Sequence, residues 1–219
     1  MQLTEALHAI ADQLNLNADE LIAYAAEDEI GGWPSERWPG GALWAVEGKT
    51  LYAITRAMQP AHILECGTRE GCSATHLLTA LMLNNSGHLI SVDLCSITDI
   101  SGAGFGGLVP PELQDRWTFR APMSAETLLD ADDTPFELVF EDTDHTFETT
   151  VSILTRLVNR AGVKVIISHD IFHPYATEAV RAAWTQVFGS EGADWRAYPI
   201  EPSDCGLAVW RNPNYAPTV

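Results

Sequence analysis

Apolar residues recur at helical spacing at the start of the chain. Leu3, Leu7, Ile10 and Leu14 follow one another at intervals of three or four positions, which places them on one face of an amphipathic helix. A second short helix is predicted around residues 21–24. The chain carries eight carboxylates before its first cation, Arg37, and we expect them to face water.

Glycine, proline and tryptophan interrupt this pattern before residue 42. Trp33-Pro34 and Trp38-Pro39 stand in a segment that also contains several glycines, and such residues end helical periodicity. We therefore expect residues 1–41 to form an N-terminal helical arm and loop, packed on the body or on a sister copy. Residues 42–219 form the larger unit.

Short apolar segments alternate with helical ones from residue 42 onward. Continuously apolar strands are typical of a parallel sheet covered by helices on both faces. The pattern predicts an α/β fold with a doubly wound, mostly parallel, seven-stranded Rossmann-like sheet. The last two strands are joined by too short a turn for a crossover, so they should be antiparallel. The expected strands are residues 62–66, 88–94, 117–121, 136–141, 163–168, 195–200 and 206–211, with helices at about 42–59, 73–83 and 147–158.

The composition restricts the partners of this fold. Acidic residues number 30 against 12 basic ones, for a net charge of −18, which opposes binding to nucleic acid and to anionic membranes. The 4 cysteines lack the spacing of a zinc ribbon or a disulfide framework. No basic start or long apolar run marks a secretory signal or a membrane span. We expect a cytoplasmic protein, with the N-terminal arm as a candidate surface for a homo-oligomer.

Two glycines follow the first expected strand. In the segment Glu65-Cys66-Gly67-Thr68-Arg69-Glu70-Gly71-Cys72-Ser73, Gly67 and Gly71 allow the backbone to turn sharply against a ligand. A dinucleotide fingerprint starting at Gly67 would need glycine at the positions of Arg69 and Cys72, so the spacing argues against a pyrophosphate. A tight turn without a ligand is the alternative.

Asp93 ends the second expected strand. It lies about 20 residues beyond Gly71, the offset at which an acidic side chain contacts a ribose in doubly wound sheets. A carboxylate can accept two hydrogen bonds from a vicinal diol. Asp93 and the glycine loop together predict a ribose-containing ligand, whereas Asp93 alone is compatible with a surface acid.

Side chains with metal-binding atoms end the fourth and fifth expected strands. Asp142 follows the fourth strand, and His169 and Asp170 follow the fifth, so all three should meet at one rim. Carboxylates suit Mg²⁺, and an imidazole shifts the preference toward Mn²⁺, Fe²⁺ or Zn²⁺. A zinc-binding pair of His169 and His173 is disfavoured, because Pro174 follows a strand end and does not continue a helix. A strand-end histidine that only forms a hydrogen bond remains the alternative.

The combined pattern resembles the class I S-adenosylmethionine-dependent methyltransferases. The likeness covers about residues 45–211 and rests on the glycine loop, on Asp93 and on the closing antiparallel strands. The segments 136–145 and 165–170 are similar to the small-molecule O-methyltransferases of the catechol and the macrocin or antibiotic-sugar types, which carry acidic metal ligands at these strand ends. Position 169 is His169 where those families have aspartate.

The resemblance implies an enzyme that methylates a hydroxyl of a small molecule, such as a sugar or a phenolic secondary metabolite. The methyl donor would be S-adenosylmethionine, and a divalent metal, Mg²⁺ or Mn²⁺, could assist. The implied metal ligands are Asp142, His169 and Asp170. The implied cofactor-binding residues are Glu65, Gly67, Gly71 and Ser73 at the methionine end, Asp93 at the ribose, and Leu94, Met123 and Ser124 beside the adenine, with Met123 standing where the family often has aspartate.

Methyl transfer to oxygen also requires a base for the hydroxyl proton. His145 stands where catechol-type enzymes have a catalytic lysine, and Asp144 stands where macrocin-type enzymes have a proposed aspartate base. We favour His145, because its ordinary pKa lies near working pH. The alternative is that it only caps the following helix.

The glycine-rich segment 101–111 has two interpretations. The segment predicts a lid beside the substrate or an inert surface loop, and Trp33, Trp38 and Phe105 are candidate aromatic walls.

Two other functions remain as alternatives to the methyltransferase. The first is an NAD(P)-dependent Rossmann oxidoreductase, which the glycine spacing opposes. The second is a non-catalytic methyltransferase-like scaffold, which the departures at Met123 and His169 leave open.

Overall fold

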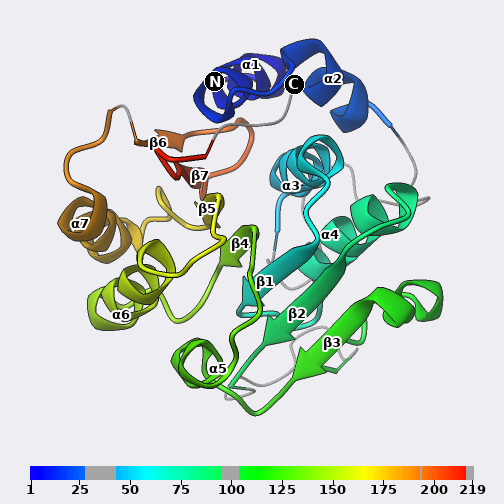
Figure 1. Cartoon of the computed structure of the whole chain (residues 1–219). Helices are drawn as coiled ribbons and strands as arrows, with labels where there is room; N and C mark the ends of the chain where they lie inside the picture. Colours follow the sequence, from blue (N-terminus) through cyan, green and yellow to red (C-terminus); the bar gives the residue numbers. More distant parts are fainter. Residues whose placement is uncertain (28–42, 95–103, 193, 216–219) are drawn as a thin grey trace.

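Seven strands form one sheet in the order β3-β2-β1-β4-β5-β7-β6 (Figure 1). The computed structural model describes residues 1–27, 43–94, 104–192 and 194–215. β7 is antiparallel to β5 and β6, and the other neighbours are parallel. This confirms the predicted sheet and its antiparallel end. The strands are β1 His62–Cys66, β2 His88–Val92, β3 Trp117–Arg120, β4 Leu138–Glu141, β5 Val165–Ser168, β6 Trp195–Tyr198 and β7 Leu207–Arg211.

Helices cover both faces of the sheet. In Figure 1, α3 and α4 lie on one side of the strands, and α5, α6 and α7 lie on the other. The short helix α5 and the longer α7 were not among the helices expected from the sequence. The helices are α1 Leu3–Leu14, α2 Ala18–Ala25, α3 Ala45–Met58, α4 Cys72–Leu83, α5 Ala125–Ala131, α6 Phe147–Val158 and α7 Thr177–Phe188, with a 3₁₀ turn, η2, over Pro111–Arg116.

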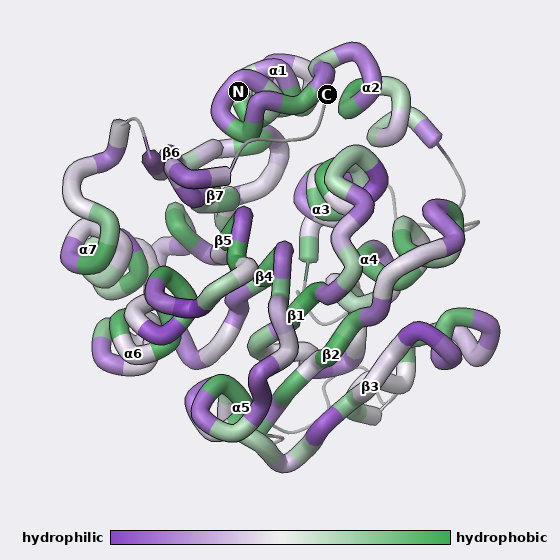
Figure 2. The backbone as a smooth tube through the Cα atoms, viewed as in Figure 1, coloured by the Kyte–Doolittle hydropathy of each residue, from purple (hydrophilic) through white to green (hydrophobic). Residues whose placement is uncertain are grey.

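Alternate residues of each strand enter opposite layers of the core. Ile63 of β1 and Phe140 of β4 pack with the apolar faces of α1 to α4, whereas their chain neighbours Leu64 and Val139 pack with α5 to α7. Figure 2 shows the central strands β1 and β2 as mainly hydrophobic. Burial on both faces explains why these strands are continuously apolar in sequence.

The first helix of the N-terminal arm packs on the body of this chain. Leu7, Ile10 and Leu14 are buried in the same cluster as β7, as their spacing predicts. The buried side chain of Gln13 donates a hydrogen bond to the carbonyl of Val209 (2.7 Å). A role of the arm in a homo-oligomer stays a prediction.

The loops between these elements are described only in part. Trp33 and Trp38, the candidate aromatic walls in the arm, and residues 101–103 of the glycine-rich segment lie outside the described residues. Within the described ranges, no helix is both long enough and apolar enough to cross a bilayer. The cytoplasmic location stays a prediction.

Candidate active site

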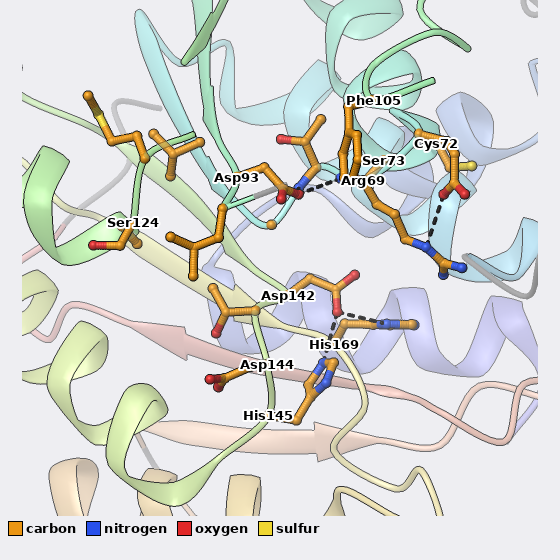
Figure 3. Close-up of a pocket in the computed structure, with 18 of the residues that line it drawn as sticks. Arg69, Cys72, Ser73, Asp93, Phe105, Ser124, Asp142, Asp144, His145 and His169 are labelled. Atoms are coloured by element: carbon orange, nitrogen blue, oxygen red, sulfur yellow. Dashed lines mark hydrogen bonds and ion pairs between the residues drawn. The ribbon is translucent and has the colours of Figure 1, made fainter. Parts of the chain in front are cut away.

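A cavity of about 490 Å³ lies at the carboxyl ends of β1, β2, β4 and β5 (Figure 3). This is the edge where a doubly wound sheet binds its ligands, next to the point where the strand order reverses at β1 and β4. Most of the residues predicted from the sequence line it: Gly67, Ser73, Asp93, Leu94, Met123, Ser124, Asp142, Asp144, His145, His169 and Asp170.

Two predicted cofactor residues, Glu65 and Gly71, lie behind the wall of the cavity. Glu65 is fully buried and accepts hydrogen bonds from the hydroxyls of Ser73 (2.5 Å) and Ser91 (2.5 Å). Gly71 begins α4 in the left-handed conformation, with a φ of 95°. Glu65 therefore positions Ser73, which does line the cavity, and Gly71 turns the backbone into α4.

Burial changes the ionisation of Glu65. Loss of solvent raises the pKa of this carboxyl to about 7, even though the hydrogen bonds from Ser73, Ser91 and Thr68 favour its charged form. The carboxyl group of Glu65, which accepts hydrogen bonds from Thr68 and Ser73 of the glycine loop, therefore titrates near neutral pH.

Asp93 holds the glycine loop from the side of β2. Its Oδ2 accepts hydrogen bonds from the backbone amides of Thr68 (2.9 Å) and Arg69 (2.8 Å). β2 ends at Val92, so Asp93 stands just beyond the strand and faces the cavity, where Figure 3 shows it opposite Asp142. Asp93 therefore joins β2 to the loop and presents a carboxylate to a bound ligand.

Arg69 and Phe105 line the same end of the cavity, and Arg69 was not predicted as a site residue. The Arg69 guanidinium forms an ion pair with the buried carboxylate of Glu70 (Nε to Oε2, 3.1 Å). Phe105, a candidate wall from the sequence, is in place because the amide of Gly106 donates to the carbonyl of Arg69 (2.8 Å). Arg69 is the one cationic residue between Gly67 and Gly71, and this feature of the sequence could have identified it as a site residue.

The ends of β4 and β5 bring four polar side chains together. The Nε2 atom of His145 lies 3.0 Å from Asp142 Oδ1 and 3.2 Å from Asp170 Oδ2. His169 Nδ1 lies 3.5 Å from Asp142 Oδ1 and 3.5 Å from Asp170 Oδ1. Figure 3 shows His145 and His169 converging on Asp142. The sequence predicted the proximity of Asp142, His169 and Asp170 from the two strand ends, but not the contact of His145 with both carboxylates.

The two histidines and the carboxylates shift each other's pKa. Burial alone would lower the pKa of His145, but the carboxylates of Asp142 and Asp170 raise it to about 9. Burial is likewise outweighed at His169, where Glu47 and Asp142 hold the pKa well above its usual value. The carboxyl pKa of Asp142, in turn, is held below its ordinary range by His169 and His145, against the effect of burial.

Asp144 has a different environment from His145. It is exposed, and its carboxylate accepts hydrogen bonds from the amide of Thr146 (3.1 Å) and the hydroxyl of Thr149 (3.1 Å) at the start of α6. This is how a residue near a helix N-terminus satisfies free backbone amides. The carboxylate of Asp144 therefore supports α6.

The donor atoms at the rim fit a divalent cation. One atom each from Asp142, His145 and Asp170 lie within 4.8 Å of one another, and the same holds for His169, Asp170 and Cys205. Oδ1 of Asp170 is buried and has no hydrogen-bond partner among the described residues. A buried acceptor of this kind requires a partner, and a cation between the carboxylates would supply one. Of the predicted ligands, Asp142 and Asp170 belong to the first group together with His145, and His169 and Asp170 belong to the second together with Cys205.

Comparison with protein families identifies the core of the chain. Residues 64–171, which span the glycine loop, Asp93 and the rim, match the family model described as a methyltransferase domain. The chain carries a methyltransferase domain. This match confirms the prediction of a class I S-adenosylmethionine-dependent methyltransferase and does not favour the oxidoreductase alternative.

Solved structures share the fold of this methyltransferase. The O-methyltransferase from Bacillus cereus in complex with S-adenosylhomocysteine aligns with a TM-score of 0.59 and 15% identity, over 93% of this chain and 96% of that one. TomG from Streptomyces achromogenes, an O-methyltransferase of tomaymycin synthesis bound to S-adenosylmethionine, gives 0.60 and 21%, over 93% and 94%.

A third structure with the same fold is a sugar methyltransferase. CalS11, a TDP-rhamnose 3′-O-methyltransferase of calicheamicin biosynthesis, aligns with a TM-score of 0.57 and 15% identity, over 96% of this chain and 94% of that one. No curated protein sequence matches the chain. At these identities, the structures establish a shared fold for the methyltransferase.

Proposed function

We propose that this methyltransferase transfers the methyl group of S-adenosylmethionine to a hydroxyl of a small molecule, such as a sugar or phenolic group of a secondary metabolite. One observation carries the proposal: a single cavity extends from Asp93 to the cluster of Asp142, His145, His169 and Asp170. It therefore offers a ribose-binding end and an end with acid–base groups. The net charge of −18 supports a small-molecule acceptor over a nucleic acid.

The donor is held at the end of the cavity formed by the glycine loop. S-adenosylmethionine supplies an electrophilic methyl group. Asp93 accepts from the ribose hydroxyls, while Ser73 and the backbone at Gly67 face the methionine part. Met123 and Leu94 form apolar walls for the adenine, and a thioether packs well on an aromatic ring.

His145 is the proposed base. Its Nε2 atom lies between the carboxylates of Asp142 and Asp170, whereas the Asp144 carboxylate is engaged by the N-terminus of α6. Because carboxylates only accept hydrogen bonds, Nε2 carries the proton in neutral His145, and a hydroxyl bound at the rim transfers its proton to the lone pair on Nδ1. The carboxylates then stabilise the imidazolium that forms.

A divalent cation bound at the same rim would assist the transfer of the methyl group. Asp142, His169 and Asp170 would hold it, and it would polarise the acceptor hydroxyl and lower the pKa of that hydroxyl. With a cation held there, protonation of His145 would be less favourable, and the base would stay available near neutral pH.

Calorimetric titration tests the proposal. S-adenosylhomocysteine and NAD⁺ are each titrated into the protein, with and without Mg²⁺. We expect S-adenosylhomocysteine to bind with or without the ion and NAD⁺ not to bind. Incubation of S-adenosylmethionine with a panel of phenols and nucleotide sugars, followed by mass spectrometry, should reveal a methylated product. Absence of binding by S-adenosylhomocysteine would contradict the proposal.

A further inference from the structure

Glu47 is a fully buried carboxylate that lies outside the cavity and directly behind the rim. It stands in the first turn of α3, with no side-chain exposure, although glutamate is rarely buried without a partner. Its Oε2 lies 2.9 Å from Nε2 of His169, which is 2% exposed. Its other oxygen, Oε1, accepts hydrogen bonds from the hydroxyl of Ser203 (2.5 Å) and the amide of Gly206 (2.8 Å). No pattern of residue types connects α3 with the end of β5.

The contact with Glu47 sets the orientation of the His169 ring. An ionised carboxylate only accepts hydrogen bonds, so Nε2 of His169 must carry the proton between them. The opposite nitrogen, Nδ1, then faces Asp142 and Asp170 at 3.5 Å from an oxygen of each. A ring held in this way presents its Nδ1 lone pair to a cation once the proton there is displaced. A carboxylate behind a histidine ligand is a recurrent device of metal sites.

We propose that Glu47 is a positioning residue that makes His169 a nitrogen ligand through Nδ1, so that the rim selects Fe²⁺, Co²⁺, Ni²⁺ or Zn²⁺ over Mg²⁺. The inference rests on the metal-assisted part of the proposed function and narrows it. Imidazole favours these later ions, whereas a set made of carboxylates alone suits Mg²⁺. Cys205, whose sulfur belongs to one candidate ligand group with His169 and Asp170, fits the same preference.

The chain allows the positioning role to be separated from a structural role. Glu47 uses Oε2 for His169 and for the amide of Trp44 at the start of α3, and Oε1 for the turn between β6 and β7, where Ser203 is its hydroxyl partner. Ser203→Ala removes the hydroxyl that contacts Oε1 and accepts from the amides of Cys205 and Gly206, and it leaves the contact of Glu47 with His169 in place. Glu47→Gln places an amide donor within reach of Nε2, which favours the tautomer that carries its proton on Nδ1 and cannot bind a cation there.

Cobalt and magnesium binding provide the test. Co²⁺ and Mg²⁺ are titrated by calorimetry into the full-length wild-type protein, Glu47→Gln, Ser203→Ala and His169→Asp, and visible absorption of the Co²⁺ form reports nitrogen ligation. We expect Glu47→Gln to weaken Co²⁺ binding by about 10- to 100-fold and to change the cobalt spectrum. Ser203→Ala should retain the wild-type affinity and spectrum. His169→Asp should lower the ratio of Co²⁺ to Mg²⁺ affinity at least about tenfold.

The results separate this inference from the proposed function. Titration of S-adenosylhomocysteine into wild type, Glu47→Gln and Ser203→Ala reports the cofactor site and the fold independently of the metal. Wild-type protein that binds S-adenosylhomocysteine but neither cation would overturn the inference and leave methyl transfer standing. Equal effects of Glu47→Gln and Ser203→Ala on Co²⁺ would also overturn it, because they would reduce Glu47 to a support of the turn. An unchanged ion preference in His169→Asp would do the same.

Discussion

The α-carbon of Gly67 lies against the carbonyl oxygen of Asp142 so closely that a methyl group on it would lie 1.9 Å from that oxygen. Gly67 also has a φ of 87°, in the left-handed region that favours glycine. The loop that faces the donor and the strand end that carries the acceptor rim therefore touch through their backbones. Any side chain at position 67 must displace one of them.

Gly67→Ala should destabilise the protein and weaken S-adenosylhomocysteine binding together. The left-handed φ and the clash should cost about 2–5 kcal/mol of unfolding free energy, measured by urea denaturation. Gly189→Ala is the matched control, because Gly189 has a φ of 79° but no atom within 4 Å of an added methyl group. Because Gly189 also has a ψ of −165°, a combination that other residues rarely adopt, that variant should lose about 1–3 kcal/mol but keep the cofactor affinity. Equal losses in both variants would contradict the importance of the contact with Asp142.

Replacing His145 with alanine should abolish most turnover without loss of cofactor affinity. Removal of a general base typically lowers kcat by about 10²–10⁴-fold. The measurement is kcat at saturating S-adenosylmethionine, with calorimetry of S-adenosylhomocysteine as the check on folding. Near-normal turnover in His145→Ala would refute its role, and a larger loss of kcat in Asp144→Asn would assign the base to Asp144.

The His145 imidazole should titrate with a pKa near 9 in metal-free protein, because Asp142 and Asp170 stabilise its charged form. The neutral base form therefore increases as pH rises through that value. Mg²⁺ or Zn²⁺ at the rim should move the transition to lower pH, since the cation competes with the proton for the same carboxylates. Proton NMR of the ring follows the titration with and without the ion. A transition below pH 7 in metal-free protein would contradict this prediction.

Glu65 should make the protein less stable as pH rises through the acid range. Its pKa is about 7 in the folded state against 4.5 for the ordinary group, so the folded state retains a proton that the unfolded state has lost. Unfolding free energy from this group should therefore fall between about pH 4.5 and 7, by about 3 kcal/mol in all. Urea denaturation across this range, compared between wild type and Glu65→Gln, isolates the effect. Parallel pH profiles for the two proteins would rule it out.

The positions of Asp93, Asp142 and Asp170 could be predicted because each follows a strand of a parallel sheet. The periodicity of apolar residues identifies such strands, and their carboxyl ends share one edge, so neighbours in space follow from topology alone. Glu65 was predicted to contact the cofactor, but its side chain is fully buried behind Ser73, which lines the cavity in its place. A side chain's direction at a sharp turn depends on backbone angles, which the pattern of residue types does not contain.

Glu47 illustrates another limit of the sequence, whereas helix α7 does not. Glu47 meets His169 across 122 positions, and a single glutamate in the first turn of a helix is usually solvated. In α7, Val180, Ala183, Trp184, Val187 and Phe188 have helical spacing over two turns, so the residue pattern contained the signal for this helix, although it was not among the helices expected above. The helix depends on packing against α6 and on the contact of Trp184 with Trp195.

The segment that carries Phe105 is anchored by its backbone. Amides of Gly106 and Leu108 donate to the carbonyls of Arg69 (2.8 Å) and Glu70 (2.9 Å), so the identity of the side chain at position 105 does not hold the segment in place. Because this segment is tied to the glycine loop, Phe105 forms a wall of the end of the cavity that is proposed to hold the donor. A library of substitutions at position 105 should therefore change the shape of that wall while the backbone framework of the loop stays in place, which makes this position a natural starting point for engineering.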